Sequence, residues 1–139
     1  LLVVNSHQHD DHVWGNAALP VGTPIIALEA SLSLANDPRF QSSLEQKRLD
    51  DTRFADVRIV APNQTFTERF VIHGGDLTLE LLPALGHCAD QLVVWIPEIR
   101  TLLATDAAEH PLPYAGDPRD LELGRGKLYA EKLLVVGER

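Results

Sequence analysis

The chain of 139 residues contains no methionine and only one cysteine, Cys88. A single cysteine excludes an internal disulfide and leaves the redox compartment open. No apolar run reaches the roughly eighteen residues of a transmembrane helix, so we expect no membrane span. No signal peptide is recognisable. Cytoplasmic localisation is therefore favoured, although the compartment is not fixed. Because the chain starts Leu-Leu-Val-Val without methionine, we expect a segment of a longer protein.

Basic residues are also scarce. The chain has twelve Lys and Arg residues and twenty Asp and Glu residues, which gives a formal net charge of −8. That balance argues against nucleic-acid binding through a basic face. Apolar residues make up 45% of the chain, enough for a folded core. The length predicts one domain over residues 1–139.

Apolar runs and breaker residues predict an alternation of strands and helices. The predicted strands cover residues 1–5, 25–27, 57–60, 65–66, 70–72, 77–82, 91–96 and 101–104. The predicted helices cover residues 15–19, 29–34, 39–54 and 121–136. A hairpin turn is expected at residues 73–76 because two glycines lie in its middle. The order of segments predicts layered α and β elements, an α+β fold. The helix at 39–54 is expected as a solvated surface helix, with a lid over a site as the alternative.

The densest chemistry follows the first predicted strand. Residues 6–13 form a predicted polar loop that contains His7, His9, Asp11 and His12 in the pattern H-x-H-x-D-H. In an extended backbone, His7 and His9 leave the chain on the same side. Imidazole and carboxylate groups are ligands for borderline metals such as zinc. Burying these groups without a metal would be unfavourable, so we interpret the loop as a site for one or two ions. The alternative is a solvated polar loop.

This motif after an apolar strand resembles the hallmark of the metallo-β-lactamase fold superfamily. Gly86-His87 resembles the family's Gly-His ligand motif, and residues 91–98 resemble the strand that follows it. Residues 102–106 resemble the strand that ends in the family's bridging aspartate, here Asp106. The resemblance runs from Leu1 to about Tyr114. It implies an αββα sandwich, present in part, because the strands that normally precede the first motif are absent. We expect the domain to be incomplete at both ends.

The resemblance also implies a binuclear site. By position, His7, His9 and His87 would hold one ion. Asp11 and His12 would hold a second ion, and Asp106 would bridge the two. Zinc is the expected metal, with iron or manganese as alternatives. The ions would generate a hydroxide near neutral pH, and Asp11 is the candidate catalytic residue that orients this nucleophile and handles its proton.

The chain departs from the family pattern at several positions. The family has a further C-terminal histidine for the second ion, but none follows His110 here. Thr105 stands where the family usually has glycine, and Cys88 where it often has threonine or serine. Cys88 could be a soft metal donor, but a packing residue beside the site is the favoured interpretation. His110 is interpreted as a loop residue, with a place at the site as the alternative.

Two other side chains have competing interpretations. His73 lies beside the predicted hairpin turn and is expected to be exposed. Trp14 follows the ligand loop, where it would either line a substrate pocket or pack beneath the metals.

The first functional hypothesis is a zinc-dependent hydrolase of the metallo-β-lactamase superfamily. Its metal-activated hydroxide would cleave an ester, thioester or amide (β-lactam) bond of a small molecule. The alternative is a non-catalytic or degenerate metal-binding scaffold domain of the same fold. A third hypothesis is a fragment that forms a homo-oligomer through exposed sheet edges. The shared fold does not name the substrate.

Overall fold

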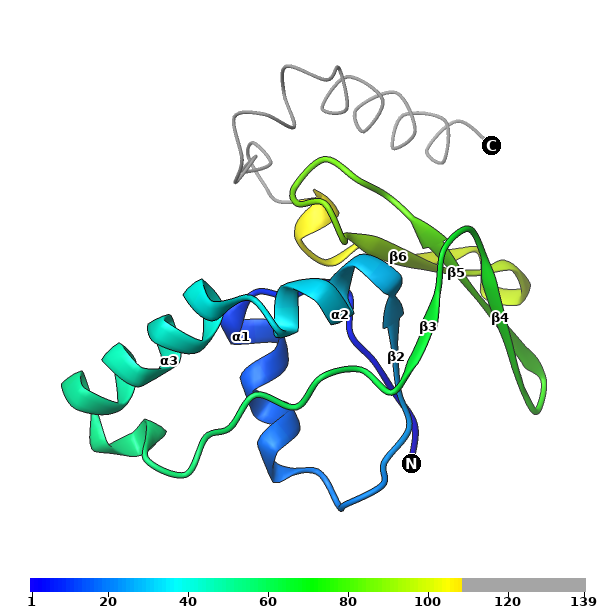
Figure 1. Cartoon of the computed structure of the whole chain (residues 1–139). Helices are drawn as coiled ribbons and strands as arrows, with labels where there is room; N and C mark the ends of the chain where they lie inside the picture. The colour runs from blue at the N-terminus through cyan, green and yellow to red at the C-terminus, as the bar shows by residue number, and fades with distance from the viewer. Residues whose placement is uncertain (109–139) are drawn as a thin grey trace. The chain divides into compact units, whose positions relative to one another are not determined.

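The computed structural model describes residues 1–108. The chain divides into two compact units, Leu1–Phe66 and Thr67–Arg139, whose elements appear in chain order in Figure 1. The predicted helix at 121–136 and His110 lie outside the described residues. The expectation of a single domain over residues 1–139 stays a prediction.

The first unit contains a parallel sheet of three strands: β1 (Val3–Val4), β2 (Ile25–Leu28) and β3 (Gln64–Phe66). Strand β2 is central and pairs with both neighbours. All four of its residues are buried, as expected for an inner parallel strand that reads as a continuous apolar run. The Asn63 side chain accepts from the Ile25 amide at 2.9 Å and donates to the Thr23 carbonyl at 3.0 Å. These bonds fix the entry to β2.

Helical segments follow β1 and β2. They are α1 (Asp10–Val13), the 3-10 helix η1 (Trp14–Ala18), α2 (Glu29–Ala35), α3 (Pro38–Asp50) and η2 (Thr52–Phe54). Asp37 caps α3 by accepting from the Arg39 amide at 2.8 Å, and Pro38 occupies the first turn, where no amide hydrogen is needed. The prediction of a helix over 39–54 is confirmed for most of its length.

An apolar core joins these helices. Val13, Trp14 and Leu44 are buried together, and the partly buried Phe40, Phe54, Val57 and Ile59 pack against them. The Trp14 ring meets the Phe54 ring edge-on at a centroid distance of 5.6 Å. The prediction of a strand at 57–60 is wrong, because these residues form an irregular segment whose apolar side chains pack against this core. The strand that pairs with β2 comes later in the chain and is β3.

The second unit contains an antiparallel sheet with strands in chain order: β4 (Phe70–Gly74), β5 (Leu77–Pro83), β6 (Leu92–Ile96) and β7 (Thr101–Leu103). The predicted hairpin turn is confirmed between β4 and β5, where Gly75 has a φ of 63° that favours glycine. The short η3 helix (Pro97–Ile99) connects β6 to β7, and Glu98 there accepts from the Thr78 amide at 3.0 Å. That hydrogen bond holds the pKa of Glu98 below its ordinary value.

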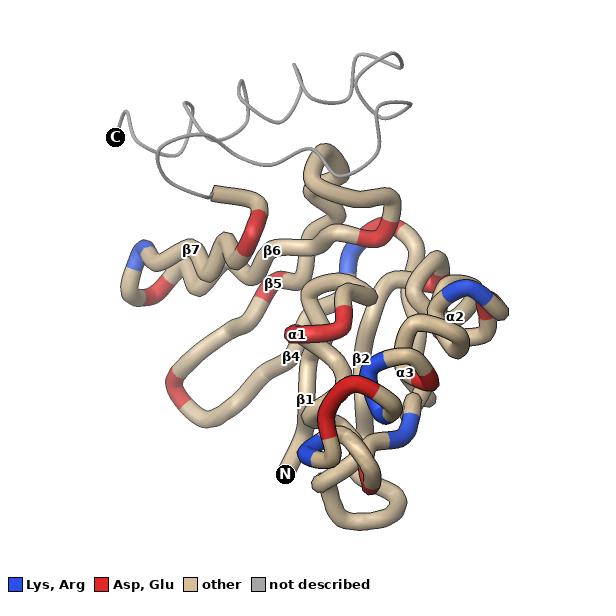
Figure 2. Tube along the Cα trace, turned by 90° about the vertical axis from the view of Figure 1, so that its left-hand side faces the viewer, with Lys and Arg blue, Asp and Glu red and all other residues tan. Residues whose placement is uncertain are grey.

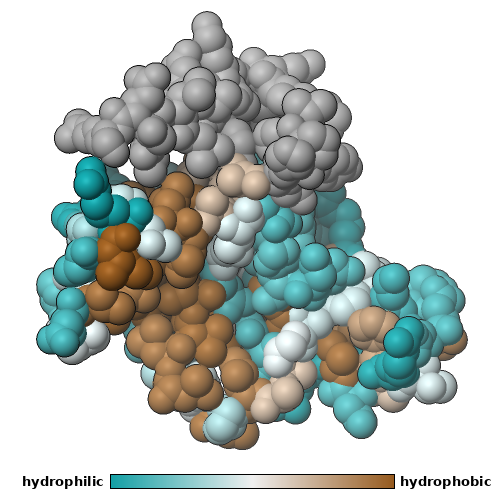
Figure 3. Space-filling model, turned by 180° about the vertical axis from the view of Figure 1, so that it is seen from behind, coloured by the Kyte–Doolittle hydropathy of each residue, from teal (hydrophilic) through white to brown (hydrophobic). Residues whose placement is uncertain are grey.

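The basic residues are few and are scattered over the described part of the chain. Figure 2 shows basic positions spread over separate segments rather than along one stripe. Figure 3 shows apolar residues among those that reach the surface, and Leu1 and Val21 are among the exposed large hydrophobics. Within the described residues, no helix has the length and apolar character of a transmembrane segment.

Candidate metal centre

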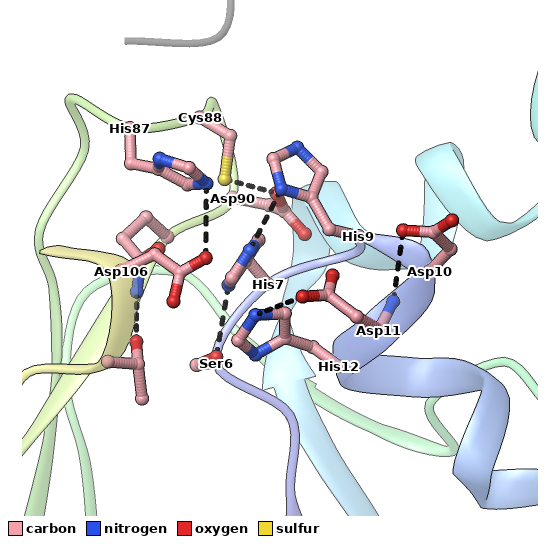
Figure 4. Close-up of polar contacts among 12 residues, drawn as sticks. Ser6, His7, His9, Asp10, Asp11, His12, His87, Cys88, Asp90 and Asp106 are labelled. Carbon is pink, nitrogen blue, oxygen red and sulfur yellow. Dashed lines mark hydrogen bonds and ion pairs between the residues drawn. The ribbon is translucent and has the colours of Figure 1, made fainter. Parts of the chain in front are cut away.

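The first set of candidate ligands lies where β1 leaves the parallel sheet. The Asn5 amide donates to the Ile26 carbonyl at 2.9 Å, so the backbone stays tied to β2 up to this point. The chain then turns, and His7 is fully buried. Figure 4 shows His7 between Ser6 and His9. Its Nδ1 lies 3.0 Å from the Ser6 hydroxyl, and its Nε2 lies 3.0 Å from Nδ1 of His9.

Helix α1 brings His12 to the same place. The amides of His12 and Val13 both donate to the His9 carbonyl at 3.2 Å, which folds the chain back directly after His9. The centroid of the His7 ring lies 4.5 Å from that of His9 and 4.1 Å from that of His12. Residues 6–13 were predicted to be a loop, and this is wrong for their second half. A single helical turn, too short for a periodic signal, gathers the three imidazoles.

The acidic residues of α1 have different roles in this turn. Asp10 accepts from the Asp11 amide through its side chain at 3.0 Å, so it supports the start of the helix. The Asp11 carboxylate lies 3.5 Å from Nε2 of His12, and its side chain is 74% exposed. Asp11 is therefore an accessible acceptor beside the imidazoles (Figure 4).

The second set of candidate ligands belongs to the antiparallel sheet. His87 lies in the loop between β5 and β6, and Asp106 lies in the 3-10 helix η4 (Thr105–Ala108) after β7. Strand β6 lies between β5 and β7 and is antiparallel to both. The end of β5, the start of β6 and the end of β7 therefore lie at the same end of the sheet. The buried His87 places its Nε2 3.6 Å from the Asp106 carboxylate.

Cys88 contacts a residue that the sequence did not single out. Its Sγ donates to Oδ1 of Asp90 at 3.2 Å, and Asp90 is buried whereas Cys88 is partly exposed. Asp90 and its neighbour Gln91 are both buried polar residues. An acidic residue directly before an apolar strand gives no sequence signal that distinguishes it from an ordinary turn residue.

Two further expectations can be compared with the structure. His73 is exposed in β4, as expected. Trp14 packs in the helical core, and it also lines an open cavity of about 370 Å³ in the first unit. The other lining residues are Gly15, Ala17, Ala18, Arg53, Phe54, Asp56 and Val57. Trp14 is therefore a core residue of the first unit, and its place in a substrate pocket or beneath the metals stays a prediction.

The fold has counterparts among solved structures. A metallo-beta-lactamase family protein from Thermus thermophilus aligns with a TM-score of 0.72 and 18% identity, over 100% of this chain and 52% of that one. A metallo-beta-lactamase from Pontibacter korlensis aligns with a TM-score of 0.66 and 23% identity, over 95% and 54%.

A third counterpart is an N-acyl homoserine lactone hydrolase with its product at the catalytic metal center. It aligns with a TM-score of 0.63 and 22% identity, over 99% of this chain and 52% of that one. The chain thus spans about half the length of these structures. No curated protein sequence matches it.

These similarities define an α+β protein with part of the metallo-β-lactamase fold, as the sequence predicted. The family model described as the metallo-beta-lactamase superfamily matches residues 1–133. The chain belongs to this superfamily.

Proposed function

We propose that this chain carries the metal site of a hydrolase that acts on a small-molecule substrate. The observation that carries the proposal is the cluster of three imidazoles that β1 and α1 build in the first unit. The chain's membership in the metallo-beta-lactamase superfamily supports it. The family match runs through both units, which supports the proposal that residues 1–139 form one domain with one site.

The donor chemistry fits a borderline cation. His7 and His9 have ring nitrogens 3.0 Å apart, in a turn where His7 is buried and His9 and His12 are partly buried. Such nitrogens are typical ligands of zinc, and iron or manganese would also accept them. We propose the ligand assignment that the family resemblance implies. His7, His9 and His87 would hold one ion, Asp11 and His12 would hold a second, and Asp106 would be a ligand of both.

The chain's own residues would support the reaction as follows. When bound, the ions lower the pKa of a water to near neutral and polarise the bond to be cut. The exposed Asp11 carboxylate would orient the attacking water by accepting its hydrogen bond, and would then take up a proton. The Ser6 hydroxyl, 3.0 Å from Nδ1 of His7, would fix the orientation of that imidazole.

We propose an ester, thioester or amide (β-lactam) as the substrate class, as the family resemblance implies. Two of the named counterparts support this choice: one is a lactone hydrolase, and a lactone is a cyclic ester, and one is a metallo-beta-lactamase, named for a cyclic amide. The net charge of −8 makes a nucleic-acid substrate the less favourable choice.

The test combines metal analysis with a substrate panel. We expect one to two zinc, iron or manganese ions per folded chain, and hydrolysis of at least one compound in a panel of esters, thioesters, lactones and β-lactams. Folded protein with bound metal but without hydrolysis of any compound would favour the metal-binding scaffold. Folded protein that takes up no metal would contradict the proposed site itself.

A further inference from the structure

Thr105, the residue directly before Asp106, has an unusual backbone. Its φ is 48°, in the left-handed region that glycine adopts easily and that a β-branched residue rarely adopts. The turn is closed by a hydrogen bond from the Ala107 amide to the Ala104 carbonyl at 3.0 Å. The conformation of Thr105 therefore sets the direction in which the Asp106 carboxylate leaves the chain.

A buried side chain holds this turn. Gln91, directly before β6, is fully buried, and its Nε2 donates to the Leu92 carbonyl at 2.7 Å and to the Thr105 hydroxyl at 2.9 Å. Its own backbone is fixed on both sides. The Gln91 amide donates to the Cys88 carbonyl at 3.4 Å, and its carbonyl accepts from the Ala84 amide at 2.9 Å. The backbone of Gln91 is thus anchored within the β5–β6 loop, and its side-chain amide reaches the Thr105 turn.

We propose that Gln91 is a positioning residue for Asp106. Its side-chain amide holds the Thr105 hydroxyl and so keeps Thr105 in the left-handed conformation that presents the Asp106 carboxylate toward His87. A glycine at position 105 would adopt this φ without such help. The consequence for metal binding rests on the proposed function, whereas the effect on the turn does not.

The test uses five variants and two measurements. Gln91→Leu removes the donor, Thr105→Val removes the acceptor but keeps the β-branched shape, and Thr105→Ser retains the hydroxyl. The last two variants are Thr105→Gly alone and Thr105→Gly combined with Gln91→Leu. The first measurement is hydrogen exchange of the Ala107 amide in metal-free protein, with the amides of the β5–β6 pairs as an internal reference for overall stability.

We expect several-fold faster exchange at Ala107 in Gln91→Leu and in Thr105→Val, with the reference amides little changed. Thr105→Ser should behave like the parent protein. Gln91→Leu should accelerate exchange much less when residue 105 is glycine. Unchanged exchange at Ala107 in the first two variants would overturn the proposal. An equal acceleration at the reference amides would overturn it too, because the side chain would then stabilise only the sheet.

The second measurement is zinc affinity by competition with a chromophoric chelator. We expect Gln91→Leu and Thr105→Val to lower the affinity for the zinc ion proposed to bind Asp106 by about 10- to 100-fold. The affinity should recover when Gln91→Leu is combined with Thr105→Gly. If the parent protein binds no zinc while the variants still show the expected exchange pattern at Ala107, that result would contradict the proposed function but support the role of Gln91 in the turn.

Discussion

The two units supply their candidate ligands in different ways. In the first unit, His7, His9, Asp11 and His12 lie within six positions and are gathered by a single turn that follows β1. In the second unit, His87 and Asp106 are far apart in sequence and meet because β6 lies between β5 and β7. The first arrangement is local, and the second depends on the register of a whole sheet.

This difference affects how robust each arrangement is. We expect that a candidate ligand of the first set can be replaced without changing the backbone of the sheet beside it. The second set depends on the packing of β5 and on the Thr105 turn, so substitutions that touch no ligand should still disturb it. The predictions below separate these two kinds of dependence, beginning with the largest expected effect.

Replacing His9 by alanine should have the largest effect. His9 contacts His7 in the imidazole cluster, so its loss removes one of the proposed metal ligands. We expect hydrolytic activity to fall below detection and bound metal to decrease, while the circular dichroism spectrum is retained. His73→Ala is the matched control, because His73 is exposed on β4. Full activity in His9→Ala would contradict the proposed mechanism.

Asp106→Asn should lower the number of bound ions. The amide keeps the shape of the side chain but removes the negative charge that faces His87 at 3.6 Å. We expect bound metal to fall from two ions toward one and activity to fall by about a hundredfold or more. Metal content is measured on the purified variant beside Asp76→Asn, in the β4–β5 turn. An unchanged metal content would show that Asp106 is not a ligand, and that the second set does not contribute as proposed.

The candidate ligands of the first unit were easier to predict because they are close together in the sequence. H-x-H-x-D-H is visible as a string of residues, and β2 and β5 follow from apolar runs whose neighbours are turn residues. The hairpin at Gly75 was predicted from its glycines. In these cases the sequence carries the signal because adjacent residues determine the structure.

The failures occurred where tertiary packing decides. Residues 57–60 have the composition of a strand, but Val57 and Ile59 bury their side chains against Trp14 and Leu44 without pairing. Gln91 looks like an ordinary polar residue beside a strand, and its hydrogen bond to the Thr105 hydroxyl depends on the turn after β7, which the sequence does not reveal. Helix α1 has only four residues, about one turn, so its hydrophobic pattern cannot repeat and gives no periodic signal. The ligand roles of all six site residues stay predictions.

Leu81→Ala tests the dependence of the second unit on its sheet. Leu81 is fully buried in β5, opposite Phe70 of β4 and Val94 of β6. Removing its side chain should lower the free energy of unfolding by about 2 to 5 kcal/mol, as measured by urea denaturation. Leu49, 81% exposed in α3, provides the control, and its replacement by alanine should change stability by less than about 0.5 kcal/mol. Equal effects of the two substitutions would show that β5 is not the core of its sheet.

The smallest effect is expected at the cap of α3, in the first unit but outside the imidazole cluster. Hydrogen bonds from the Arg39 side chain and amide lower the pKa of Asp37 to about 2 from an ordinary value of 3.8. Because the folded pKa is the lower one, the carboxylate stabilises the fold fully above pH 3.8. Its contribution is lost as the pH falls through 2.

Asp37→Asn isolates this titration, because asparagine still caps a helix but carries no charge. We expect the melting temperature of the variant to be lower by about a few degrees at pH 6, and the difference from the parent protein to shrink steadily between pH 4 and pH 2. Thermal melts followed by circular dichroism over this range measure it, with Asp56→Asn as the control. A difference that stays constant with pH would show that the charge of Asp37 does not stabilise α3. A change in bound metal at neutral pH would show that the cap and the imidazole cluster are coupled, against the local character of the first set.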